Sequence, residues 1–236
     1  MSVRRLIHAY RRHRYALLFY SLLLTLGAGP LVAALDIDRN WIRVFLELNL
    51  FAAVIGVSNM RRWRPLRLCL AFVIAARLLA LIVDAEALAI ATRPLVIGIG
   101  FATAVGALRF ALRAPRVDTE HVYAALGAYL LAGVFAALLH FQIEQLWPGS
   151  YTSGGAAIPG FSLATAIYFS FVTLATLGYG DIVPQSEVTR GVAVVEAIAG
   201  QLYLAVLVAR LVSTSRRPFG RARERPTVVQ SHVDRY

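Results

Sequence analysis

The segment 176–181, with the sequence TLGYGD, limits the fold of this chain more than any other stretch. It lies between an apolar run that ends at Ala175 and another that begins near Thr189. Two glycines, Gly178 and Gly180, can adopt backbone angles that a Cβ disfavours, so successive carbonyl groups can turn towards one axis. Irregular backbone at membrane depth is tolerated only where protein buries it or water lines it. The segment therefore has to be enclosed by protein or to line a water-filled space. A glycine-rich turn between two membrane helices is the alternative.

The same segment resembles the selectivity filter of the potassium channel superfamily, where rings of backbone carbonyls replace the water shell of the ion. The resemblance covers roughly residues 124–212. An apolar stretch long enough for a short pore helix, 161–175, directly precedes the filter and supports it. Gly200 lies where the family has the hinge glycine of its inner helix. Gln201 and Leu204 lie where family members line the water-filled cavity.

The resemblance implies the ion ligands. K⁺ is expected at the backbone oxygens of Thr176, Leu177, Gly178 and Tyr179, with Gly180 completing the filter. K⁺ is the permeant ion, and no cofactor is expected. The chain departs from the commonest family pattern at three places: Leu177 replaces Val or Ile, Ala175 replaces a second Thr, and Tyr168 and Phe169 replace two Trp.

Four residues around the filter are expected to support it. Family members hydrogen-bond the Asp that follows the filter from the position of Tyr168, so we expect its hydroxyl to donate to the Asp181 carboxylate. Solvation of Asp181 in the vestibule is the alternative. Phe169, unlike Trp, cannot donate to the Tyr179 hydroxyl, which leaves Thr173 as the expected partner of that hydroxyl.

Glu196 is a further candidate, because an acidic residue at membrane depth is functional by default. It lies four residues before Gly200 and therefore shares its helix face. We expect Glu196 to accept hydrogen bonds from Ser170 or Thr173, or to be protonated. An acid with a structural role only is the alternative.

His140 and Glu144 share one face near the outer end of the helix expected over 121–145. A pH-sensing pair is one interpretation. Two solvated surface residues are the favoured interpretation.

Composition indicates an all-α integral membrane protein. The chain is 58% hydrophobic and its mean hydropathy is +0.65, whereas roughly half of the residues are apolar and a quarter charged in soluble domains. Six transmembrane helices are expected at 15–35, 41–60, 66–83, 94–110, 121–145 and 189–212, with a re-entrant pore helix and filter between the last two. A signal peptide is the alternative for the first apolar run.

The arginines set the expected topology. All 24 basic residues are Arg, and most lie before the first span, after the second and fourth spans, and from Arg210 onward. By the positive-inside rule, both termini lie in the cytoplasm and the chain crosses the cell membrane several times. The net charge of +11 is then explained by the membrane topology and by contact with anionic lipid head groups, and not by binding of nucleic acid.

Five parts follow from these boundaries. They are a basic cytoplasmic N-terminus (1–14), a four-helix membrane bundle (15–113), a short linker (114–120), a pore domain (121–212) and a basic cytoplasmic tail (213–236). One chain supplies one filter segment, while a carbonyl cage needs four, and the chain has no internal repeat. We therefore expect a homotetramer.

Inside the bundle, Glu47 and Arg77 each lie about 9 Å below the outer end of their span, counted at 1.5 Å per residue. A charge in lipid is costly unless it is paired, so we expect these two side chains to form an ion pair. Arg43 is the competing partner of Glu47.

The expected function is passive, K⁺-selective conduction with weak or absent voltage dependence. The fourth span has no charge between Arg93 and Arg109, a gap of roughly 24 Å at 1.5 Å per residue. A voltage-gated channel that uses Arg109, Arg113 and Arg116, and a membrane interaction or sensor subunit that does not conduct, are the alternatives. An enzyme is not expected, because no His, Cys or carboxylate cluster has metal-ligand or triad spacing.

Overall fold

The computed structural model describes residues 13–27, 49, 52–53, 64–83, 91–113 and 118–215. A first helix covers 13–27. The elements that follow are α3 (Arg64–Ile82), α5 (Arg93–Arg113), α6 (Thr119–Leu146), β1 (Tyr151–Ser153), β2 (Ala156–Ala157), α7 (Leu163–Leu174), β3 (Val183–Pro184) and α8 (Glu187–Ser215). The helices α5, α6, α7 and α8 begin and end within three residues of the fourth span, the fifth span, the pore helix and the sixth span predicted from the sequence.

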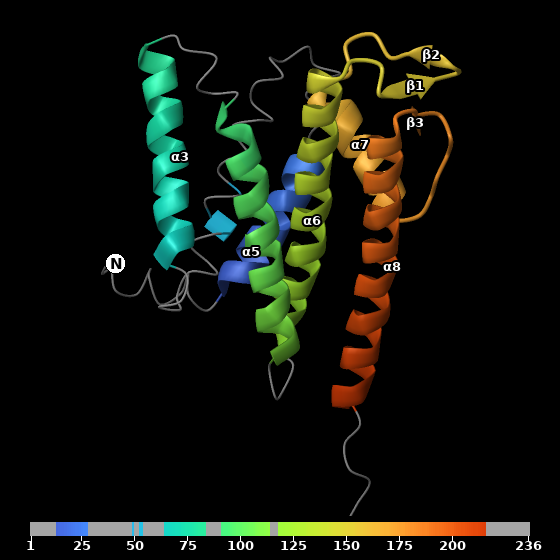
Figure 1. The fold of residues 1–236 in the computed structure, drawn as a ribbon. Helices are drawn as coiled ribbons and strands as arrows, with labels where there is room; N and C mark the ends of the chain where they lie inside the picture. Colours follow the sequence, from blue (N-terminus) through green and yellow to red (C-terminus); the bar gives the residue numbers. More distant parts are fainter. Residues whose placement is uncertain are drawn as a thin grey trace, which may run out of the picture.

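The long helices α5, α6 and α8 lie side by side, and the short helix α7 lies between α6 and α8 (Figure 1). Among the described residues, these three long helices are long and apolar enough to cross a membrane. The chain is therefore a membrane protein with a mostly helical fold. Only parts of the first two expected spans are described, so the number of six spans stays a prediction.

Short polar side chains begin two of these helices. Asp118 caps α6, where its carboxylate accepts a hydrogen bond from the His121 amide at 3.0 Å. Burial raises the pKa of Asp118, but the hydrogen bonds from His121 outweigh this effect and hold the pKa below its usual range. Ser162 caps α7 in the same way, since its hydroxyl accepts from the Thr165 amide at 3.1 Å.

A three-stranded sheet, with strand order β2-β1-β3, stands next to the end of α6 and the start of α8 (Figure 1). The sequence did not predict strands here, and this short sheet is a small addition to a mostly helical fold. Strands β1 and β2 pair antiparallel around Gly154 and Gly155, which have φ angles of 57° and 82°. Two glycines with positive φ form the tight turn whose twist suits a hairpin.

The largest apolar core joins the first helix to α5 and α6, with residues such as Tyr15, Leu22 and Leu131 buried in it. Helices α5 and α6 approach closely at Gly100, where a Cβ would lie 2.2 Å from a ring carbon of Phe135. The four-helix bundle and the outer helix of the pore domain therefore share packed side chains.

A polar contact also lies inside the bundle. The buried Asn49 donates to the Thr25 hydroxyl at 3.0 Å, and the Ser21 hydroxyl donates to Asn49 Oδ1. The expected ion pair lies outside the described part, because neither Glu47 nor the side chain of Arg77 is described, so this pair stays a prediction.

Candidate functional site

The loop that joins α7 to β3 contains the filter segment, residues 176–180. Thr176, Gly178 and Gly180 have φ angles of 56°, 57° and 77°, while Leu177 and Tyr179 have negative φ. Every second residue is therefore left-handed. This alternation lets successive carbonyl groups face one side, which is the arrangement that a ring of carbonyl ligands requires.

Thr176 is the one described residue other than glycine that has a positive φ. A β-branched side chain in this region is a genuine outlier, and such a conformation costs about 1–3 kcal/mol. Two contacts hold it. The Thr176 amide donates to Thr173 O at 2.9 Å, and the Thr176 hydroxyl accepts a hydrogen bond from Gln201 Nε2 at 3.0 Å.

The amide groups at the start of the filter segment point back to the end of α7. Leu177 N donates to Val172 O at 2.8 Å, and Gly178 N approaches the same oxygen at 3.4 Å. Within the described part of the chain, the carbonyl oxygens of 176–180 accept no hydrogen bond. Polar groups without partners need water, a ligand or another chain. These oxygens are therefore free to bind a cation.

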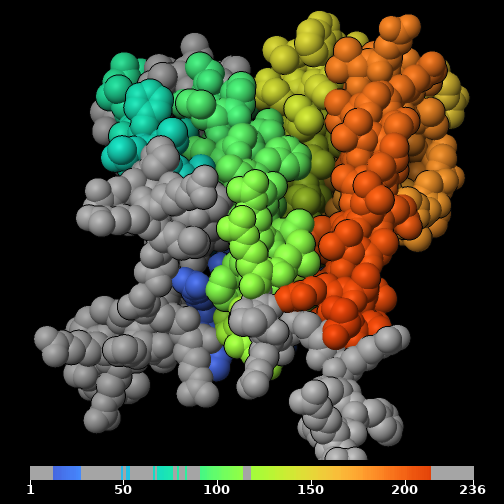
Figure 2. Space-filling model, turned by 60° about the horizontal axis from the view of Figure 1, so that its bottom comes forward, coloured from blue at the N-terminus to red at the C-terminus, as the bar shows by residue number. Residues whose placement is uncertain are grey.

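The filter segment lies on the surface of the single chain. Leu177 is 56% exposed and Tyr179 is 66% exposed. Helix α8 beside it also leaves a wide face uncovered (Figure 2). Large apolar side chains that are exposed on this helix include Val194, Val195, Ile198 and Leu202.

The hydrogen bond predicted behind the filter segment is present, with Tyr168 Oη donating to Asp181 Oδ2 at 2.7 Å. The other predicted contact is absent, since the Tyr179 hydroxyl forms no hydrogen bond with Thr173 within this chain. Phe169 packs elsewhere. Its ring meets the His140 ring edge to face, with 4.9 Å between the ring centroids.

Glu196 accepts a hydrogen bond from Ser170 Oγ at 2.5 Å, which is one of the partners that the sequence predicted. Ser170 Oγ also lies 2.7 Å from Gly133 O on α6. The second oxygen of Glu196 lies 2.7 Å from His140 Nε2. Glu196 thus joins α8 to both α7 and α6.

His140 is not a solvated surface residue, which corrects the favoured interpretation of the sequence. Its side chain is fully buried, and its Nδ1 lies 2.5 Å from Tyr151 Oη. The expectation failed because the chain after α6 folds back as β1 and covers this face of the helix. Sequence reasoning also missed Tyr151 itself, whose signal was one large aromatic residue in a loop of small and polar residues.

Glu144 is buried as well, with 6% of its surface exposed. Its carboxylate accepts hydrogen bonds from Gly149 N at 2.8 Å and from Tyr151 N at 3.2 Å. This carboxylate therefore fixes the start of the loop that leads to β1, and it does not form a pair with His140.

Gly200 lies where α8 crosses the end of α7. A Cβ at this position would lie 2.2 Å from Leu174 O, a backbone atom that cannot move cheaply. Helix α8 is continuous through Gly200. The close approach explains why a glycine stands here, and its role as a hinge stays a prediction. Leu204, one turn further on, is 40% exposed.

Comparison with known proteins agrees with this geometry. Residues 125–217, which include α7, the filter segment and α8, match the family model described as "Ion channel". The chain is 36% identical over 95 residues to "Two pore potassium channel c" from Oryza sativa subsp. japonica, covering 39% of this chain and 18% of the relative. No solved structure matches the chain significantly.

Two bacterial relatives also match part of the chain. The chain is 31% identical over 96 residues to "Inward rectifier potassium channel Kirbac3.1" from Paramagnetospirillum magnetotacticum, covering 39% of this chain and 28% of the relative. It is 41% identical over 75 residues to "Voltage-gated potassium channel Kch" from Escherichia coli (strain K12), covering 32% of this chain and 17% of the relative. The matched region thus spans less than a third of each of these relatives, and it confirms the resemblance to the potassium channel superfamily.

Proposed function

We propose that four copies of this chain form a channel that conducts K⁺ passively and selectively across the cell membrane. The single observation that carries the proposal is the filter segment, whose alternating backbone leaves its carbonyl oxygens without hydrogen-bond partners among the described residues. In this arrangement Thr176, Leu177, Gly178 and Tyr179 supply the ion ligands, and Gly180 completes the turn. Four such segments around one axis would replace the water shell of the ion.

The exposed faces of the single chain support a homotetramer. A filter segment that lies on the surface needs other chains to enclose it, and the uncovered face of α8 carries the apolar side chains that such contacts require (Figure 2). In the tetramer, Gln201 and Leu204 line the cavity below the filter segment, and Gly200 is the hinge of the inner helix. The basic termini lie in the cytoplasm, against anionic lipid head groups.

The test compares two glycines that have the same backbone angle. Gly178 in the filter segment and Gly154 in the hairpin both have φ 57°, and a Cβ on either would meet no atom within 4 Å. Replacement by alanine therefore brings similar backbone strain to both sites. We expect Gly178→Ala to abolish K⁺-selective flux into liposomes and Gly154→Ala to keep it.

The flux is measured with a K⁺ gradient and, separately, with a Na⁺ gradient. Wild-type protein that carries neither ion while it remains a folded tetramer would favour an interaction or sensor subunit that does not conduct. Equal loss of flux in both alanine variants would contradict the role assigned to the filter segment.

A further inference from the structure

His140 is the centre of a buried polar network that the ion ligands do not explain. Its two ring nitrogens contact Tyr151 on β1, at 2.5 Å, and Glu196 on α8, at 2.7 Å. Through Glu196 the network reaches Ser170 on α7. One imidazole on α6 therefore connects β1, the helix before the filter segment and the helix after it.

The hydrogen bonds assign the protons in this network. Burial raises the pKa of Tyr151, and the nearby charges of Glu196 and Glu144 raise it further. The Tyr151 hydroxyl thus keeps its proton and donates it to His140 Nδ1, which leaves the ring N–H on Nε2 to donate to Glu196. The other oxygen of Glu196 lies 2.5 Å from Ser170 Oγ.

Few other titratable groups face this imidazole. Tyr151 faces it from β1 and Glu196 from α8, while Glu144 lies one turn further along α6. Among its described residues, α7 contributes the Phe169 ring and the Ser170 hydroxyl, neither of which titrates.

The contacts of α8 with the rest of the chain are divided at Gly200. Before it, the Thr189 hydroxyl donates to Ser150 O at 3.3 Å, and Glu196 binds His140 and Ser170. Gly200 itself lies against the Leu174 carbonyl. Beyond it, Gln201 Nε2 donates to the Thr176 hydroxyl at 3.0 Å, and the Tyr203 hydroxyl donates to Ala125 O. The first part of α8 (187–199) is therefore tied to α6 and α7 through the buried Glu196, and the last part (201–215) is tied to the filter segment and to α6.

We propose that His140 is a positioning residue of the pore, which holds β1 and the first part of α8 at fixed places around α6 and α7. The proposal rests on the proposed channel function, because α7 and the first part of α8 are the helices on either side of the filter segment. His140 can act in this way because its two ring nitrogens contact Tyr151 and Glu196 at the same time.

Removal of the Tyr151 hydroxyl should weaken this link. Among the described residues, His140 is the hydrogen-bond partner of this hydroxyl, so a variant without the hydroxyl releases β1 from the network.

The first measurement is hydrogen–deuterium exchange of backbone amides in the assembled protein. Tyr151→Phe removes the hydroxyl alone, and His140→Gln removes the ring. Loss of one buried hydrogen bond should speed exchange in α7 and in the first part of α8 by about tenfold. Exchange in the last part of α8 should not change. Tyr123→Phe is the matched control, because it removes a tyrosine hydroxyl that contacts only Tyr20 within the described residues.

The second measurement is K⁺ flux in the same variants. The pH is the same for all variants in this series. We expect Tyr151→Phe to lower the flux and Tyr123→Phe to keep it. Wild-type flux in Tyr151→Phe would count against the positioning role.

The two measurements separate this inference from the proposed function. Faster exchange confined to α7 and the first part of α8, in protein that carries no K⁺, would refute the channel and support the positioning role. Wild-type exchange in Tyr151→Phe, or equally faster exchange along the whole of α8, would refute the positioning role even in a protein that conducts. If His140→Gln does not fold, Tyr151→Phe alone decides between these results.

Discussion

The side chains behind the filter segment decide how firmly its carbonyl oxygens are held. Asp181 follows the segment directly, and its carboxylate accepts the hydrogen bond from Tyr168 at 2.7 Å. The end of the filter segment is thereby tied to α7, the helix that also binds its first amides. At its other end, Thr176 keeps a strained conformation through contacts with Thr173 and Gln201.

The variant Tyr168→Phe tests this bond. Without the hydroxyl, Asp181 turns to water and the filter segment loses a contact at one end. Both partners are exposed, which weakens their hydrogen bond, so we expect K⁺ affinity to fall by less than about tenfold. The stabilisation of the tetramer by K⁺ over Na⁺, followed by thermal unfolding, measures it. An unchanged K⁺ effect would mean that the bond does not support the filter segment.

At the scale of the elements, α8 packs on α7 through Gly200. The variant Gly200→Ala places a methyl group where the Leu174 carbonyl lies, at 2.2 Å. Overpacking of this kind costs typically about 1–3 kcal/mol. Gly191, on the same helix, has no atom within 4 Å of an added Cβ. Alanine in a helix interior is better than glycine by up to about 1 kcal/mol, so Gly191→Ala should be neutral or stabilising.

The free energy of unfolding in detergent compares these two variants. If Gly200→Ala were as stable as Gly191→Ala but changed the open probability, Gly200 would act as a hinge without a packing role. Lower stability of Gly200→Ala alone supports the close approach of α8 to α7.

Local spacing explains which elements the sequence predicts. The helices follow from apolar runs of the right length, and the contact of Tyr168 with Asp181 joins two positions 13 residues apart that follow a family pattern. The burial of His140 does not follow from local spacing, because β1 covers it from a different part of the chain. The hairpin is also missed, since two-residue and three-residue strands have too few positions to show alternation. The expected contact of Thr173 with Tyr179 is absent from this chain.

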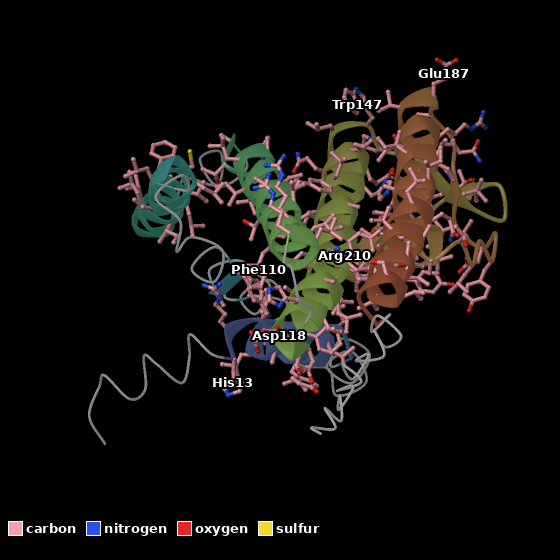
Figure 3. All side chains as sticks on the ribbon, turned by 90° about the horizontal axis from the view of Figure 1, so that it is seen from below. His13, Phe110, Asp118, Trp147, Glu187 and Arg210 are labelled. Carbon is pink, nitrogen blue, oxygen red and sulfur yellow. The ribbon has the colours of Figure 1, made fainter. Side chains whose placement is uncertain are left out.

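At the scale of the whole molecule, one aromatic stack joins the bundle to the pore domain. Phe110 near the end of α5 stacks on Tyr15 of the first helix, at 4.8 Å between centroids, and on His121 of α6, at 4.6 Å. His13, Phe110 and Asp118 gather at this end of the molecule (Figure 3). The stack places three helices in fixed contact, so α5 cannot slide along its axis without breaking it.

This contact bears on voltage dependence, because it limits the movement of α5. Arg109 and Arg113 are exposed and flank Phe110, at the end of α5 that the stack holds. Each charge that crosses the full membrane contributes about 2.3 kcal/mol per 100 mV, so steep gating needs several moving charges in each chain. We therefore expect a conductance–voltage curve in planar bilayers that corresponds to less than about one elementary charge. The double variant Arg109→Gln and Arg113→Gln should keep the same curve, and a steep curve that this variant flattens would show instead that α5 moves as a voltage sensor.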